Sequence, residues 1–427
     1  MKKISFIINA SNNTLDHIKL LLRSLKENLH DKQHEILIFV DSDNEGLTDY
    51  LINQKSNFHD LKIITHKIKP CVGYSRNSNL LVELAKYDIV SYLQSDMVIS
   101  TNYDADILSE IEDNCILSAT RVEPPLHGYS DKVITMDFGT NPELFDMASW
   151  NSYANKNKEN KSVEYFFAPF TFHKKDWLSI GGYDTLFRRG REDSDLLQRF
   201  IQAGIKIKQT FKANVYHFSC VSSRGKNWFD QNNEEAKKRV ELQKIADGIE
   251  LRRFIKKWGG FNHGENKLSK LDMDLVIKDD RELNPMFLAQ VEVYFSRVWL
   301  KTEDHRQKCI NLFSREHDPA NELLGFSKED WDQSSRFYNK TDFESIYRVG
   351  EPEDFNIKVD VDFTNADPKT DLFIQNVTRL YDIIGSSEPG IYELGSAKIE
   401  VKNLVNLAQD QIVVNNPSFD YTLLSIQ

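Results

Sequence analysis

The chain has 427 residues, of which 40% are hydrophobic and 28% charged. This is the composition of a globular protein that is long enough for two or three domains. Its 54 basic and 65 acidic residues give a formal charge of −11, which disfavours a polyanion such as nucleic acid as the main partner. No apolar run approaches the roughly 20 residues of a membrane span, and the apolar stretch near the N-terminus is too short for a signal peptide. We therefore expect a cytoplasmic protein.

The first half of the chain alternates apolar, β-rich runs with segments of helical periodicity. Strands alternating with helices predict an α/β fold whose mainly parallel sheet is covered by helices on both faces. The predicted elements are strands at 4–9, 35–40, 61–65 and 88–93, and helices after Thr14 and over 77–87.

Polar residues follow the carboxyl ends of three of these predicted strands. Asn9 and Ser11 end the first, Asp41 follows the second, and the run Gln94 to Asp96 follows the fourth. Ligands of open parallel sheets bind at that edge. The chain has neither a GxGxxG motif after a strand nor a GxxxxGK[ST] loop, which argues against a dinucleotide oxidoreductase and a P-loop enzyme.

Three carboxylates are crowded into one short segment, "REDSDLLQRFI", after a Gly-Gly pair at 181–182. Glu192, Asp193 and Asp195 precede apolar residues at helical spacing, so they belong to the first turn of a predicted helix. Acidic residues at a helix N-terminus are stabilised by the macrodipole and need no other purpose. The segment by itself therefore leaves a structural and a catalytic interpretation open.

The second half has a different pattern, with soft boundaries near 230 and 350. Residues 231–350 are charged and mainly helical in pattern, the clearest run being "NEEAKKRVELQKIADGIELRRFIKKW". Its apolar positions suit a helix packed along one face. Residues 351–427 are β-rich, and "NIKVDVDF" alternates as a half-buried strand does. We expect domains at 1–230, 231–350 and 351–427.

Four segments of the first half, in order, resemble motifs of the GT-A-fold nucleotide-sugar glycosyltransferases, closest to glycosyltransferase family 2. The resemblance covers residues 3–220 and implies a Rossmann-like mixed, mainly parallel sheet. It also implies a nucleotide-sugar donor and an acceptor hydroxyl. The segments are the strand ending in Asp41, "GYSRNSNLLVELAKYDIVSYLQSD", "GGYDTLFRRGREDSDLLQR" and "VYHFS".

The resemblance implies roles for residues that would bind the nucleotide. Asp41 matches the residue that hydrogen-bonds the base, usually uracil, with Asn9 and Ser11 as neighbours. Arg76 matches an arginine that approaches the base or the diphosphate. For Asp41 a strand-end turn is nearly as good an interpretation, and for Arg76 a surface salt bridge is the alternative.

The segment Gln94, Ser95 and Asp96 stands where the family has its DxD motif. Asp96 matches the direct metal ligand and His217 a downstream metal-binding histidine, so the resemblance implies a divalent cation, Mn²⁺ or Mg²⁺, with histidine favouring Mn²⁺. Gln94 departs from the pattern, because it offers a neutral acceptor where many relatives have a carboxylate. A turn-forming Asp and a core histidine are the structural alternatives.

The resemblance also answers why carboxylates are crowded at 192–195. It implies that Asp193 is the general base that takes the proton from the acceptor hydroxyl, with inversion at the anomeric carbon. Glu192 would contact the acceptor sugar, and Asp195 would be a structural cap. Gly182, with Gly181, would let the backbone pass close beneath the sugar.

We therefore expect an inverting, metal-dependent hexosyl- or N-acetylhexosaminyl-transferase that moves a sugar from a UDP-linked donor to a hydroxyl of a glycan. Residues 231–427 would order the acceptor or build a homo-oligomer interface. Two alternatives remain: a non-catalytic glycan-binding or scaffold protein, and a glycosyltransferase acting on modified DNA bases, which the acidic balance disfavours. Two further segments are candidates for a lid, 222–230, and for an acceptor contact, His127 and Tyr129.

Overall fold

The chain forms two compact units in the computed structural model. The first consists chiefly of Met1–Lys244 and Val413–Gln427, and the second of Ile245–Asn321 and Ser327–Ile412. The structure describes residues 2–11, 14–41, 46–66, 73–126, 131–187, 190–219, 232, 234–260, 268–279, 288, 291–313, 345–364, 369–414, 416 and 421–424.

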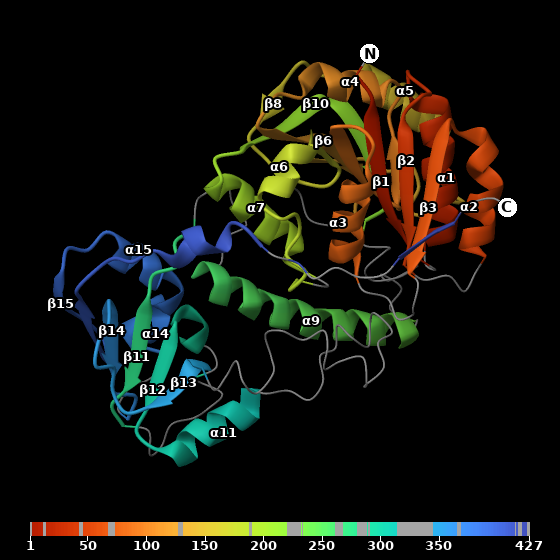
Figure 1. The fold of residues 1–427 in the computed structure, drawn as a ribbon. Helices are drawn as coiled ribbons and strands as arrows, with labels where there is room; N and C mark the ends of the chain where they lie inside the picture. The colour runs from red at the N-terminus through yellow and green to blue at the C-terminus, as the bar shows by residue number, and fades with distance from the viewer. Residues whose placement is uncertain are drawn as a thin grey trace. The chain divides into compact units, whose positions relative to one another are not determined.

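The first unit is built on one mixed sheet of 11 described strands (Figure 1). Its main path runs β17-β3-β2-β1-β4-β9-β6-β10-β5, with β7 beside β6 and β8 beside β10. Strands β3, β2, β1 and β4 are mutually parallel, whereas β9 runs antiparallel to β4 and β6. The bounds are β1 (Ile4–Ala10), β2 (Glu35–Val40), β3 (Asp60–His66), β4 (Ile89–Gln94), β5 (Met97–Ile99), β6 (Cys115–Glu123), β7 (Val133–Thr135), β8 (Ser162–Val163), β9 (Phe170–His173), β10 (Lys206–His217) and β17 (Tyr421–Leu424).

The α/β class and the mixed sheet predicted from the sequence are confirmed. The four strands predicted first lie within one residue of β1, β2, β3 and β4. Helix α1 buries Ile18, Leu21, Leu22 and Leu25, the apolar positions that recur every three or four residues. The helices of this unit are α1 (Leu15–Asn28), α2 (Leu47–Gln54), α3 (Tyr74–Leu84), α4 (Tyr103–Glu110), α5 (Met147–Lys156), α6 (Lys174–Ser179) and α7 (Glu192–Gln202).

The end of the chain returns to the first unit. Strand β17 pairs antiparallel with β3 at the edge of the large sheet. The Asn416 side chain donates to the carbonyls of Gly181 and Tyr183, at 2.8 Å each, and accepts from the Thr185 N–H at 3.0 Å. The sequence assigned these residues to a separate β-rich region, because a pairing across some 350 positions leaves no local pattern.

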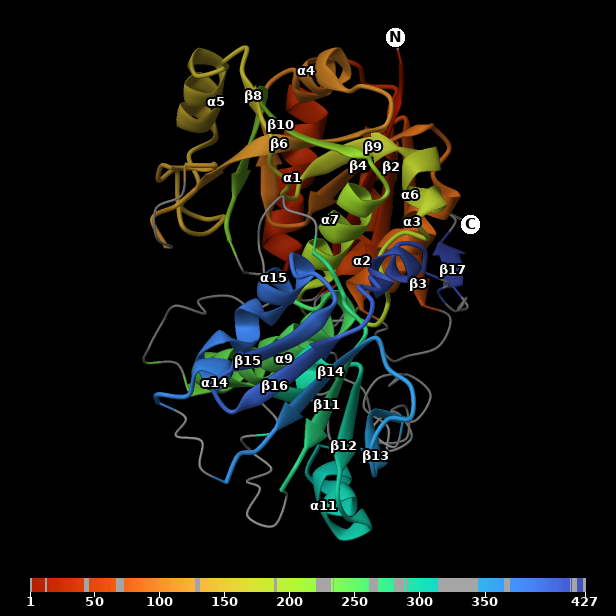
Figure 2. The ribbon, with the colours of Figure 1, turned by 90° about the vertical axis from the view of Figure 1, so that its left-hand side faces the viewer.

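The second unit has its own sheet, in the order β13-β12-β11-β14-β16-β15 (Figure 2). Residues predicted as a helical region and as a β-rich region both supply strands to it. The helical expectation is met by α9 and α11, but the middle region also contains β11, β12 and β13. The elements are α9 (Glu234–Trp258), which spans the boundary of the units, β11 (Met273–Ile277), β12 (Arg297–Leu300), α11 (Glu303–Phe313), β13 (Tyr347–Val349), β14 (Ile357–Val361), α14 (Leu372–Asn376), α15 (Leu380–Gly385), β15 (Gly390–Leu394) and β16 (Ala397–Val401).

One face of this sheet forms the core of the second unit. Ile357, Val359 and Val361, which the sequence placed on one side of a strand, are fully buried there. The prediction that α9 packs along one apolar face is only partly confirmed. Ile245 is 40% exposed, whereas the charged Glu250 is fully buried and pairs with Arg253 at 3.0 Å. No helix in the described ranges is long and apolar enough to cross a bilayer.

The first turn of α7 contains a buried ion pair that the sequence did not reveal. Asp195 was expected to cap the helix, but its carboxylate bonds to Nε of Arg199, one turn later, at 2.7 Å. Both side chains are completely buried, and Arg199 also donates to the carbonyl of Ile180 at 3.0 Å. The position before the helix is Arg191, in the left-handed region, without a side-chain cap. The third carboxylate of the cluster therefore holds α7 in place.

We predict that Arg199→Met destabilises the first unit by about 3 to 5 kcal/mol, because it leaves the Asp195 carboxylate buried without its counter-charge. Urea unfolding of the full chain measures the loss. Lys19→Met, which breaks the exposed pair with Asp16, is the matched control and should cost less than about 1 kcal/mol. Equal losses in the two variants would contradict a structural role for the buried pair.

Candidate functional site

Strand register brings the predicted nucleotide-binding residues to one edge of the sheet. Asn9 at the end of β1 lies opposite Gln94 at the end of β4, and Asp41 directly follows β2. Helix α3 connects them, because the Asn9 amide donates to Ser78 at 2.7 Å and the Asn77 amide donates to Asp41 at 2.9 Å. The side chains of Asn9, Asp41 and Gln94 are therefore gathered at the carboxyl ends of β1, β2 and β4.

This edge has acceptor groups that no donor among the described residues satisfies. The amide oxygens of Asn9 and Gln94 are both buried and make no hydrogen bond within the described residues. Buried polar atoms are normally bonded, so two neighbouring exceptions mark a place for ligand or water donors. Ser11 forms the turn into α1, where the Thr14 hydroxyl donates to its carbonyl at 2.7 Å. Arg76 is half-buried on α3, one residue before Asn77.

A second group of charges lies where β4 turns into β5. Asp96 in this turn is completely buried, and neither of its carboxylate oxygens has a hydrogen bond in the described part of the chain. Strand β10 pairs with β5 so that His217 lies opposite Met97, next to Asp96. His217 Nε2 is 3.6 Å from Asp96, and its Nδ1 is 2.7 Å from Glu123 at the end of β6.

Asp96 and His217 each shift the pKa of the other. Burial alone would raise the pKa of Asp96, but the charge and hydrogen bonding of His217, the charge of His17 and a backbone hydrogen bond together lower this pKa to about 2. Burial would lower the pKa of His217, but the Asp96 charge and the hydrogen bonds to Asp96 and Glu123 together raise it. In the absence of a metal ion, each residue therefore favours the charged form of the other.

These residues fit a divalent cation. Glu123 fixes Nδ1 of His217 and leaves Nε2 directed at the buried, unbonded Asp96 carboxylate, as outer partners of metal-binding histidines do. One hard oxygen donor and one imidazole suit Mn²⁺. Within the described ranges no group of three or more His, Cys, Asp or Glu side chains could hold a metal ion, so other ligands would complete the coordination.

The first turn of α7 carries Asp193, whose carboxylate lies in an environment that shifts its pKa. Asp193 is half-buried and accepts a hydrogen bond from the Tyr183 hydroxyl at 2.7 Å. Burial raises the pKa of Asp193, although the Tyr183 hydrogen bond and the charge of Arg121 oppose the shift. Glu192, also half-buried, precedes it as the first residue of the helix. The pKa direction brings Asp193 closer to the range of a general base.

Arg121, on β6, interacts with carboxylates of both groups: Asp96 and Glu123 in one, and Asp193 in the other. Its guanidinium is 3.4 Å from Glu123 and lies 3.7 Å above the ring of Phe167. The carboxylates of Asp193 and Asp96 both act electrostatically on this buried arginine. Sequence reasoning missed Arg121, Glu123 and Tyr183 as members of the site, because "RVE" at the end of a strand has no recognisable spacing.

Gly182 has a structural reason to be glycine. Its φ is +70°, and a Cβ would come within 2.3 Å of both Asn79 Oδ1 and Trp177 Nε1. Its predicted place beneath a sugar remains a prediction. The proposed lid at 222–230 and the candidate contacts His127 and Tyr129 lie outside the described residues.

Part of the first unit matches a known protein family in sequence. Residues 151–220 match the family model of the N-terminal domain of galactosyltransferase. The match contains β9, α7 and β10, and with them Asp193 and His217. The predicted resemblance to GT-A-fold glycosyltransferases is thereby confirmed for this segment. No curated protein matches the chain in sequence.

Solved structures show weaker likenesses. GalNAc-T7, crystallised with UDP, GalNAc and Mn²⁺, is 15% identical over 50% of this chain, with a TM-score of 0.38. TarS of S. aureus is 17% identical over 82% of this chain, with a TM-score of 0.39. The chain spans 43% and 56% of the lengths of these two proteins. Both scores are below 0.5, so neither protein is a template for the details of this site.

We predict that Asp96→Asn lowers the pKa of His217 in metal-free protein, because it removes the negative charge that favours the imidazolium. Histidine-selective NMR titration measures it. The raised pKa means that the pair stabilises the fold below the unfolded pKa of about 6.5, and that this contribution is lost as pH rises through the folded pKa. Asp113→Asn, an exposed carboxylate at the other end of β6, is the control. An unchanged His217 titration in Asp96→Asn would refute the pairing.

Proposed function

We propose that the first unit is an inverting glycosyltransferase that moves a sugar from a UDP-linked donor to an acceptor hydroxyl. The observation that carries the proposal is the connection, through Arg121, of the Asp96, His217 and Glu123 group to the Asp193 carboxylate of α7. The galactosyltransferase-type segment contains His217 and Asp193. A group suited to a cation and a carboxylate with a raised pKa are what transfer from a nucleotide sugar requires.

The nucleotide would bind along the carboxyl ends of β1, β2 and β4. Asp41 is positioned by Asn77 and retains acceptor capacity for a donor group of the base. The unbonded amide oxygens of Asn9 and Gln94 can accept from base or ribose. Gln94 thus acts as a neutral acceptor where a second carboxylate would repel the diphosphate.

Asp96 and His217 would hold the cation, with Glu123 fixing the histidine ring. A divalent cation supplies positive charge that stabilises the diphosphate leaving group. In its absence the Asp96 charge and hydrogen bonds raise the pKa of His217, whereas a bound cation would favour the neutral imidazole.

Asp193 would act as the general base. Its carboxylate accepts the proton of the acceptor hydroxyl while the hydroxyl oxygen forms the new bond to the anomeric carbon. The bond from that carbon to the diphosphate breaks on the opposite face, so the configuration inverts. Tyr183 orients the carboxylate through its 2.7 Å hydrogen bond, and the charge of Arg121 opposes the rise in the Asp193 pKa that burial causes. Glu192, next to the base, is placed to contact the acceptor sugar.

We predict that Asp193→Asn reduces sugar transfer by about 10² to 10⁴, because the amide keeps the shape of the carboxylate but cannot accept the proton. Release of UDP and formation of glycosylated acceptor are measured together with UDP affinity, which should change little. Asp113→Asn serves as the control for loss of one negative charge. Retention of more than about a tenth of the transfer rate would exclude Asp193 as the base.

The proposed cation site depends on two protein ligands, which can be removed one at a time. Asp96→Ala and His217→Ala should each weaken the Mn²⁺-dependent part of UDP binding, since each removes one of two protein ligands. Calorimetry with UDP in the presence of Mn²⁺ or of EDTA measures this part. If the wild-type chain binds UDP equally well under both conditions, the proposed cation site is wrong. A wild-type chain that binds glycans without releasing UDP from any donor would instead favour the non-catalytic alternative.

A further inference from the structure

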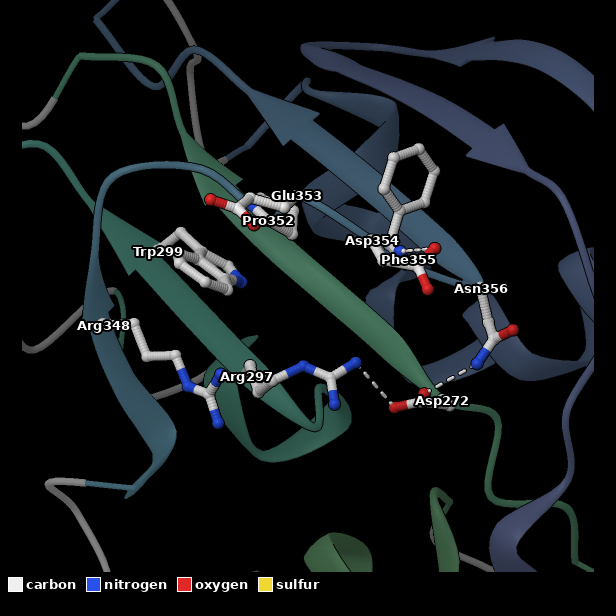
Figure 3. Close-up of a pocket in the computed structure, with 9 residues that line it drawn as sticks. All are labelled: Asp272, Arg297, Trp299, Arg348, Pro352, Glu353, Asp354, Phe355 and Asn356. Carbon is white, nitrogen blue, oxygen red and sulfur yellow. Dashed lines mark hydrogen bonds and ion pairs between the residues drawn. The ribbon is translucent and has the colours of Figure 1, made fainter.

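The sheet of the second unit has a polar face with a pocket. In β12, Val298 and Leu300 point into the core, so Arg297 and Trp299 lie on the opposite face. A pocket of about 440 Å³ opens above them, in the size range of small-molecule sites. Figure 3 shows the side chains of Arg297, Trp299 and Arg348 on neighbouring strands at its floor. The pocket is lined by Asp272, Arg297, Trp299, Arg348, Pro352, Glu353, Asp354, Phe355 and Asn356.

A charged network beneath the pocket fixes the indole of Trp299. Its N–H donates to the completely buried Asp274 at 2.6 Å. Arg297 bonds to the same carboxylate through Nε at 2.6 Å and reaches Asp272 at 2.9 Å. Asp272 in turn accepts from the Asn356 amide at 2.9 Å. The edge of the partly buried indole is thus held rigidly, while Arg297 is neutralised by two carboxylates.

Other polar groups around the indole are not committed to the protein. The exposed guanidinium of Arg348 lies 5.5 Å from the centre of the Trp299 ring and makes no hydrogen bond to any described residue. The exposed carboxylate of Glu353 likewise has no hydrogen bond or ion pair within the described ranges. Asp354 bonds only the N–H of Phe355, at 2.9 Å, leaving its other oxygen available. The pocket therefore combines a rigid aromatic surface with uncommitted donors and acceptors.

The side chains of the pocket favour some classes of ligand over others. An immobilised indole offers a face for the C–H groups of a sugar ring, and carboxylates and a guanidinium can bond several hydroxyls at once. Arg348 is opposed by two acidic neighbours, so the uncommitted groups carry a net charge of about −1. A phosphate or another polyanion is disfavoured on that ground. A neutral ligand with many hydroxyls satisfies donors and acceptors together.

We propose that this pocket binds a neutral, hydroxyl-rich saccharide, as a segment of the acceptor glycan of the first unit. The identification of the saccharide as acceptor rests on the proposed function, whereas the binding itself does not. A purely structural network would explain the burial of Asp274. It gives no reason for a partly buried indole beside uncommitted hydrogen-bonding groups.

Isothermal titration of the full chain tests the proposal, without nucleotide and at physiological salt. The probes are neutral hexasaccharides of glucose, galactose, N-acetylglucosamine and N-acetylgalactosamine, with inorganic phosphate and hexalysine as competing chemistries. We expect at least one hexasaccharide to bind, and Arg348→Ala to weaken it by about tenfold or more. Arg379→Ala, an exposed arginine of the same unit outside the pocket, is the matched control and should leave the affinity unchanged.

Trp299→Ala should abolish saccharide binding. Because this substitution also removes a partner of Asp274, its thermal unfolding is compared with wild type, and Arg348→Ala decides the matter if Trp299→Ala does not fold. No binding of any hexasaccharide by the wild type would overturn the proposal, as would equal affinities in Arg348→Ala and Arg379→Ala. Binding of hexalysine or phosphate alone would overturn it in favour of another ligand class.

UDP binding by the same preparations separates this proposal from the glycosyltransferase function. Loss of saccharide affinity in Arg348→Ala with UDP affinity intact supports the pocket. Saccharide binding by a wild-type chain that binds no nucleotide would refute the proposed function and leave the pocket standing. UDP binding without any saccharide binding would refute the pocket alone.

Discussion

The burial of the Asp96 carboxylate constrains the arrangement of the first unit's site. A completely buried carboxylate without hydrogen bonds is costly unless a positive charge lies beside it. His217 supplies that charge, and Glu123 holds the histidine ring in the required orientation. Strands β5, β10 and β6 must therefore lie next to one another at this end of the sheet. The antiparallel pairing of β5 with β10, in an otherwise mainly parallel sheet, brings Asp96 and His217 together.

Arg121 extends this arrangement to the helix that carries Asp193. Its buried guanidinium interacts electrostatically with Asp96 and with Asp193, so the Asp96 and His217 group and the candidate base are coupled rather than independent. Asp195 has a different role on the same helix. It forms a buried pair with Arg199, whose second bond reaches the carbonyl of Ile180. Asp195 therefore holds in place the helix that carries Asp193.

The two units use charge in a similar way at sites of different chemistry. In each, a fully buried carboxylate lies beside a cationic side chain: Asp96 beside His217, and Asp274 beside Arg297. In the first unit the buried carboxylate is itself the proposed ligand of a cation. In the second it lies beneath Trp299 and leaves the indole and uncommitted polar groups to face the pocket.

The sequence by itself determined strands β1 to β4 and helix α1 and placed α3 within about three residues, though it did not predict α2, because apolar periodicity there is set by burial on a sheet or on one helix face. It also indicated Asn9, Asp41, Gln94 and Asp96 as neighbours, since the carboxyl ends of parallel strands meet at one edge. Only the tertiary structure decided that Glu123 and Arg121 join Asp96 and Asp193, that Asp195 pairs with Arg199, and that β17 completes the first sheet. The same holds for the pocket of the second unit, whose strands come from regions of different local pattern. Contacts between residues distant in the chain depend on strand order and register, which local spacing does not encode.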